Sequence, residues 1–179
     1  METNTNCLGS YKEFLLPFID AGYRFIKFPE ATGADRELTL RHDIDFDTQL
    51  ALRCAEQEVE LGIRSTYFFL LRSEFYNPFS ASTYKEICAI RDMGHDISIH
   101  FDPTLYDDFH AGFREEQQFF ETVFQVPVRT ISLHRPNEFF QSYNEPIGAV
   151  EHTYQTKYFK DIKYFADSTG VWRFGHPHT

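Results

Sequence analysis

Hydrophobic and polar positions along the chain follow two periods in turn, which predicts alternating strands and helices. Apolar residues recur at helical spacing in four stretches: 11–21, 47–61, 83–93 and 109–125. Shorter stretches alternate or are continuously apolar, as strands are: 38–42, 65–71, 96–100, 129–133 and, more weakly, 163–166. Strand and helix alternate four times with short connections, which is typical of a parallel α/β sheet.

Local signals refine two of these helices. Thr83 and Glu86 have the spacing of a capping box, so the helix 83–93 is expected to begin there. In the helix before it, Leu50, Cys54 and Leu61 are expected to share the buried stripe.

Polar side chains recur at the ends of the predicted strands. They are Asp43 and Asp45, His100 and Asp102, His134 and Arg135, and Asp167. In parallel α/β architectures the carboxyl ends of the strands form one edge, where sites assemble. The sequence therefore predicts that these groups meet in one site.

The residue types in these groups are those of a metal site for hydrolysis. Asp45, His100 and one further donor could hold a divalent metal with open positions, and Asp43 could stand beside it as a base. As an alternative, Asp43 and Asp45 would cap the following helix, although Asp47 already suits that role. His100 and His134 could instead be buried core histidines.

Composition narrows the class of protein. The chain has 179 residues and is expected to form a single domain, 1–179, with motifs within 38–172. A net charge of −10 without a basic stripe argues against a nucleic-acid partner. No long apolar run follows the polar start, so neither membrane insertion nor a signal peptide is expected, and we expect a cytoplasmic protein.

His95, after Gly94, is expected in a turn.

Five short runs resemble the motifs of a known family. They are Leu40-Arg41-His42-Asp43-Ile44-Asp45 and the segments 62–68, 94–100, 132–137 and 165–173. In this order they resemble the polysaccharide deacetylase superfamily (carbohydrate esterase family four), and in particular its bacterial surface-polysaccharide branch. The resemblance covers residues 38–172.

This resemblance implies an α/β fold, a distorted (β/α) barrel of the polysaccharide deacetylase type, incomplete at the C-terminus with about five βα units. It implies a divalent metal, usually zinc, and hydrolysis of an N-acetyl or related acyl group on an amino sugar or oligosaccharide, with metal-bound water as nucleophile. The roles it implies are Asp43 as base, Asp45 and His100 as ligands, Arg135 orienting the base, Asp167 holding Arg135, and Trp172 lining the acyl pocket.

Two departures from the family pattern shape the expectations. Thr104 stands where the family has a second histidine, so the third ligand must be another residue. His134 is preferred, because imidazole suits zinc, and Asp102 is the alternative. If Asp102 is not a ligand, it is expected to contact the substrate. The family's general-acid histidine lies well beyond a position like Trp172, while this sequence stops at Thr179. We therefore expect either a shortened form of a longer protein or a second chain, such as another copy in a homo-oligomer, that covers the open barrel edge.

The sequence also admits two other functions. The missing general acid favours a catalytically impaired deacetylase-fold protein that binds carbohydrate or a protein partner. A glycosyltransferase could use Asp43 and Asp45 to hold a metal and a nucleotide diphosphate, but this leaves His100 and His134 unexplained.

Overall fold

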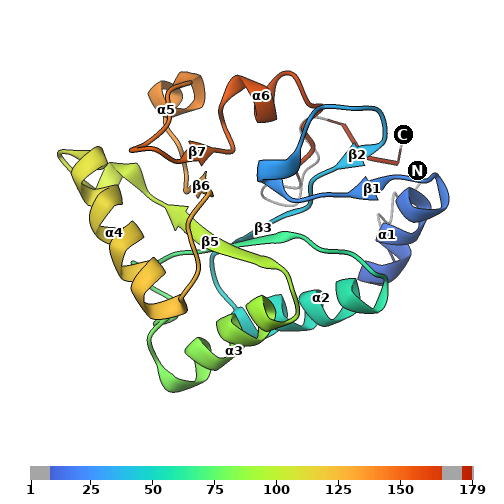
Figure 1. Ribbon diagram of the computed structural model, residues 1–179, viewed down its shortest axis with the longest axis horizontal. Helices are drawn as coiled ribbons and strands as arrows, with labels where there is room; N and C mark the ends of the chain where they lie inside the picture. Colours follow the sequence, from blue (N-terminus) through green and yellow to red (C-terminus); the bar gives the residue numbers. More distant parts are fainter. Residues whose placement is uncertain (1–8, 167–174, 179) are drawn as a thin grey trace, which may run out of the picture.

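In the computed structural model, which describes residues 9–166 and 175–178, the chain forms an α/β fold around a five-stranded parallel sheet (Figure 1). The strands, in their spatial order, are β3 (Arg41–Ile44), β4 (Thr66–Phe69), β5 (Asp96–Phe101), β6 (Thr130–Leu133) and β7 (Glu151–His152). Neighbouring strands pair in parallel throughout. β3 and β7 form the two edges, and no described strand joins them. The predicted α/β class with a parallel sheet is thus confirmed.

Helices surround this sheet. They are α1 (Tyr11–Asp20), α2 (Thr48–Glu60), α3 (Ala81–Asp92), α4 (Phe109–Phe124), α5 (Glu138–Ser142) and α6 (Thr156–Phe159), with 3-10 turns η1 (Phe28–Glu30) and η2 (Pro103–Leu105). Figure 1 shows α2 and α3 together below the sheet, and α5 and α6 on the opposite side. A two-stranded parallel sheet of β1 (Arg24–Phe25) and β2 (Glu37–Leu38) lies beside α1. Among the described residues, no helix combines the length and apolarity needed to span a bilayer.

One predicted strand is wrong in part and another is wrong entirely. The stretch 38–42 is not one strand, because Leu38 pairs with Phe25 in the small sheet whereas Arg41 pairs with Thr66 in the large one. Residues 163–166 are not a strand, and the fifth strand is β7. Alternation indicates an extended backbone but not the strand with which it pairs. A two-residue strand such as β7 is too short to show a period.

The predicted start of α3 is also wrong. Ser80 caps this helix, and its side chain accepts the backbone N–H of Thr83. Glu86 does not complete a capping box, since its carboxylate accepts the hydroxyl of Thr48 on α2. The helix therefore begins one turn earlier than the Thr83–Glu86 spacing predicted.

The two faces of the sheet differ in chemistry. Side chains facing α2, α3 and α4 are apolar and buried, among them Tyr67, Phe69, Ile99, Ile131 and Leu133. Because side chains alternate along a strand, the intervening residues point the other way, and these include Arg41, Asp43, His100 and Ser132. The face toward α2, α3 and α4 thus forms the main core, whereas the other face combines a smaller apolar cluster around Phe68 with these polar side chains.

The buried stripe of α2 is not the one predicted. Leu50 is 58% exposed, and the buried positions are Thr48, Ala51, Ala55 and Glu58. Small residues at these positions let α2 pack closely against its neighbours. The buried carboxylate of Glu58 interrupts the apolar periodicity on which the prediction rests.

Glu58 is the centre of a buried polar cluster between α2 and the sheet. Its carboxylate accepts the hydroxyls of Ser65 at 2.6 Å and Tyr67 at 3.0 Å, and it lies 2.6 Å from Nε2 of His42. Burial alone would raise the pKa of Glu58, but these contacts lower it to about 2. His95 belongs to this cluster, because its Nδ1 accepts the N–H of Ser65. The residue is 3% exposed and lies between the turn at Gly94 and β5, so the prediction that His95 is a turn residue is wrong.

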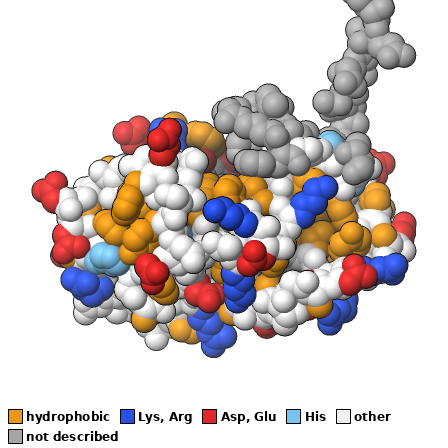
Figure 2. Space-filling model, turned by 90° about the horizontal axis from the view of Figure 1, so that it is seen from above, with side chains coloured by type: hydrophobic (Ala, Val, Ile, Leu, Met, Phe, Trp, Pro, Cys, Tyr) orange, Lys and Arg blue, Asp and Glu red, His pale blue; other side chains and the backbone are white. Residues whose placement is uncertain are grey.

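Charged and hydrophobic side chains mix over the surface. On the face that Figure 2 shows, hydrophobic groups form separate patches between acidic and basic side chains. Single exposed hydrophobic residues are ordinary in globular proteins. An exposed aromatic ring therefore points to function only when its position adds a second reason.

Candidate metal centre

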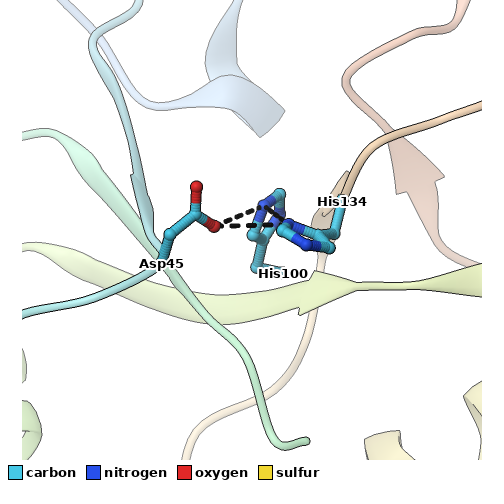
Figure 3. A group of neighbouring side chains, drawn as sticks. All are labelled: Asp45, His100 and His134. Atoms are coloured by element: carbon cyan, nitrogen blue, oxygen red, sulfur yellow. Dashed lines mark hydrogen bonds and ion pairs between the residues drawn. The ribbon is translucent and has the colours of Figure 1, made fainter. Parts of the chain in front are cut away.

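Three of the polar residues predicted to share a site do meet, at the carboxyl edge of the large sheet (Figure 3). Asp45 directly follows β3, His100 lies near the end of β5, and His134 directly follows β6. The N–H of His134 donates to the carbonyl of Phe101 at 2.7 Å, which extends the β5–β6 ladder and fixes where His134 leaves the sheet. Figure 3 shows all three side chains pointing toward one another.

Their donor atoms form a nearly equilateral triangle. His100 Nε2 lies 3.1 Å from His134 Nδ1, and each nitrogen lies 3.3 Å from Oδ1 of Asp45. Zinc bonds to imidazole and carboxylate of about 2.0–2.1 Å in a tetrahedron put ligand atoms about 3.3–3.4 Å apart. The triangle therefore has the size that three ligands of one ion require.

The hydrogen bonds around His100 assign its protons. The single hydroxyl proton of Ser132 is donated to Asp43 at 2.7 Å, so His100 Nδ1, 2.9 Å from the same oxygen, must carry a proton and donate it. In the neutral imidazole, Nε2 then has a free lone pair facing Asp45, whose Oδ1 is buried without a hydrogen-bond partner. Acceptor atoms that face one another across 3.3 Å are satisfied by a cation.

The protonation states of the other two residues suit metal binding. Burial lowers the pKa of His134, which favours the neutral imidazole that can bind a metal. Burial alone would raise the pKa of Asp45, but its contacts with His100 and His134 outweigh burial and hold the pKa below its usual value. Asp45 is therefore ionised and His134 neutral at neutral pH.

Asp43 borders this triangle as a tightly held carboxylate. Its oxygens accept Arg41 Nε at 2.9 Å and Arg41 Nη2 at 2.6 Å, and Oδ2 lies 3.9 Å from Nε2 of His100. Burial alone would raise the pKa of Asp43, but the Arg41 charge, helped by His100 and Ser132, holds it far below the usual value. Asp43 is thus an anion fixed beside the triangle, and in the metal-free protein it is a weak base.

Arg41 and Ser132 were not foreseen as site residues. Arg41 is 12% exposed in its side chain, donates to Ser132 Oγ at 2.7 Å, and lies over the ring of Tyr154. Arg135, which the resemblance assigned to Asp43, is exposed and forms no hydrogen bond or ion pair with the described residues. The sequence did carry a signal, since Arg41 precedes Asp43 by two positions and so shares its face of β3.

The remaining predicted site residues have other positions. Asp102 caps η2, where its carboxylate accepts the N–H and the hydroxyl of Thr104, so it is not part of the triangle. His134 takes the third position, as preferred from the sequence. A substrate contact by Asp102 stays a prediction. Asp167 and Trp172 lie outside the described residues.

Comparison with known proteins adds no family assignment. No family model matches the sequence, and no curated protein matches it either. Function is therefore inferred from the metal centre and its surroundings.

Proposed function

We propose that the protein is a metal-dependent hydrolase that removes an N-acetyl or related acyl group from an amino sugar of a surface-polysaccharide precursor. One observation carries this proposal: the triangle of Asp45, His100 and His134 with the carboxylate of Asp43 at its border. The order of motifs resembling polysaccharide deacetylases adds the class of substrate.

The residues have distinct tasks in such a reaction. Three protein ligands leave part of a metal's coordination sphere open to substrate and water, and a zinc ion there would polarise the acyl carbonyl and acidify water. Asp43 accepts a hydrogen bond from the attacking water and takes its proton, while Arg41 and Ser132 hold the carboxylate in place. Two imidazoles with one carboxylate also suit iron(II). We propose zinc, and metal analysis of the purified protein distinguishes the two ions.

We also propose that the five strands belong to a distorted (β/α) barrel of the deacetylase type. Support comes from the uniformly parallel pairing from β3 to β7 and from helices following the strands. The position of the ligands at the carboxyl edge agrees with the usual place of sites in such barrels.

Acetate release tests the proposed activity. Zinc-loaded protein should release acetate from UDP-N-acetylglucosamine or from oligosaccharides of N-acetylglucosamine. Asp43→Asn should slow this release by about 10²–10⁴-fold while zinc stays bound, because it removes a positioned base. Asp47→Asn is the matched control, since Asn caps α2 as Asp does and lies outside the triangle. Acetate release that Asp43→Asn leaves unchanged would contradict the assigned role of Asp43.

One observation favours a second candidate, a carbohydrate-binding protein with impaired catalysis. Asp43 is already saturated by Arg41 and Ser132, and its lowered pKa makes it a weak proton acceptor. A zinc-loaded protein that binds these sugars and releases no acetate would establish this candidate in place of the hydrolase.

A further inference from the structure

Two exposed aromatic rings contact each other next to the metal centre. Phe46 directly follows the ligand Asp45 and is 59% exposed, and Phe75 is 62% exposed. Their ring centroids are 4.8 Å apart with the planes at 69°, an edge-to-face pair. Two large apolar groups left together in water are costly, and here they adjoin a ligand rather than a remote surface.

The loop that carries Phe75 is fixed by hydrogen bonds at the same edge of the sheet. The hydroxyl of Tyr76 donates to the carbonyl of Ile44 at 2.8 Å and accepts the N–H of Leu70 at 2.8 Å. These two partners stand at the carboxyl ends of β3 and β4. Ser73 Oγ also accepts the N–H of Phe75 at 3.1 Å. Phe75 is therefore held against Phe46 by the frame that positions Asp45.

We propose that Phe46 and Phe75 form an aromatic wall that packs against the apolar C–H face of the substrate's pyranose ring, and this rests on the proposed function. A pyranose carries hydroxyls around its rim and C–H groups on its faces, so it needs an apolar wall beside polar groups. An aromatic face is electron-rich and attracts such C–H groups. Asp45 of the ligand triangle directly precedes Phe46, so a polar and an apolar contact adjoin each other along the chain.

The position of the pair favours a sugar over a second protein copy. Phe46 is bonded to a metal ligand in the chain, so a protein partner covering it would also restrict access to the open side of the site. Because Phe46 directly follows Asp45, a ring seated on Phe46 and Phe75 would lie beside that ligand. The wall thus gives the hydrolase a preference for N-acylated hexosamines over small acetamides.

Binding and kinetics test the wall separately from the reaction. Binding of the N-acetylglucosamine tetrasaccharide and of UDP-N-acetylglucosamine is measured by calorimetry on full-length, zinc-loaded protein. Phe46→Ala and Phe75→Ala should each weaken binding about tenfold, from the loss of one aromatic contact. KM for acetate release should rise by the same factor with kcat little changed, and zinc content should stay at the wild-type value. Phe75→Tyr should retain binding.

Phe119→Ala is the matched control, because Phe119 is 63% exposed on α4 and belongs neither to the triangle nor to the aromatic pair. Binding lost in the two wall variants but no acetate release in wild type would support the wall and refute the hydrolase. Acetate release with unchanged KM and binding would refute the wall alone. The wall is also overturned if wild type binds neither probe, or if the wall variants convert a dimer to a monomer in sedimentation without changing sugar affinity.

Discussion

His100→Ala is expected to reduce bound zinc from one ion per chain to less than about a tenth of that in metal analysis after dialysis. The imidazole is 3% exposed and is locked by Ser132, so its Nε2 is the most rigidly placed donor of the triangle. Its loss leaves two ligands, and hydrogen-bonded ligands account for much of a site's affinity. His178→Ala, at an exposed histidine outside the triangle, should bind zinc as wild type does.

Asp45→Asn separates a metal site from a merely structural cluster. In the metal-free protein, an amide N–H can donate to His100 Nε2, where Asp45 now faces it as a second acceptor at 3.3 Å. We expect this variant to lose zinc yet unfold at the same or a higher temperature than metal-free wild type. A large loss of stability in metal-free Asp45→Asn, or full zinc binding by His100→Ala, would contradict the assigned centre.

Arg41→Met is expected to destabilise the metal-free protein by about 3 kcal/mol in urea unfolding, because it leaves Asp43 without its cation in a largely buried place. The Asp43 side chain is 26% exposed and accepts three hydrogen bonds from Arg41, two from Nε and one from Nη2. Arg135→Met should change the free energy of unfolding by less than about 0.5 kcal/mol, as exposed positions do. If Arg135→Met destabilised the protein more than Arg41→Met does, Arg135 and not Arg41 would be the residue that holds Asp43.

The effect of Arg41→Met should depend on pH in one direction. The pKa of Asp43 is lowered in the folded protein, so its stabilising contribution is present above the unfolded value of about 3.9 and is lost as pH falls below it. The stability difference between wild type and Arg41→Met should therefore narrow below about pH 4. In the double variant Arg41→Met with Asp43→Asn, part of the lost stability should return, because no unpaired charge remains.

Much of the architecture could be predicted because it depends on local periodicity. The continuously apolar β4 and the alternating β5 were recognised as strands, and a regular chain of strands and helices places strand ends on one edge. Asp45, His100 and His134 could be chosen for the same reason, since each stands at such an end and carries a metal-binding group.

Other features depend on partners distant in sequence. The backbone carbonyl of Leu40 accepts the N–H of Thr66, where the chain begins to pair with β4. Because tertiary contacts set this pairing, the alternation of residues 38–42 does not show that β2 ends and β3 begins within it. Glu58 is buried because Tyr67, Ser65 and His42 converge on it, which no helical period reveals. The resemblance implies Arg135 as the partner of Asp43, whereas alternation along β3 places Arg41 beside Asp43.

The metal centre is tested most directly by X-ray absorption at the zinc edge of the zinc-loaded protein. The structure predicts two imidazole nitrogens and carboxylate oxygen at about 2.0–2.1 Å, with no sulfur. A sulfur shell at about 2.3 Å, which would point to a cysteine ligand, or a spectrum with no imidazole scattering would contradict a site made of Asp45, His100 and His134.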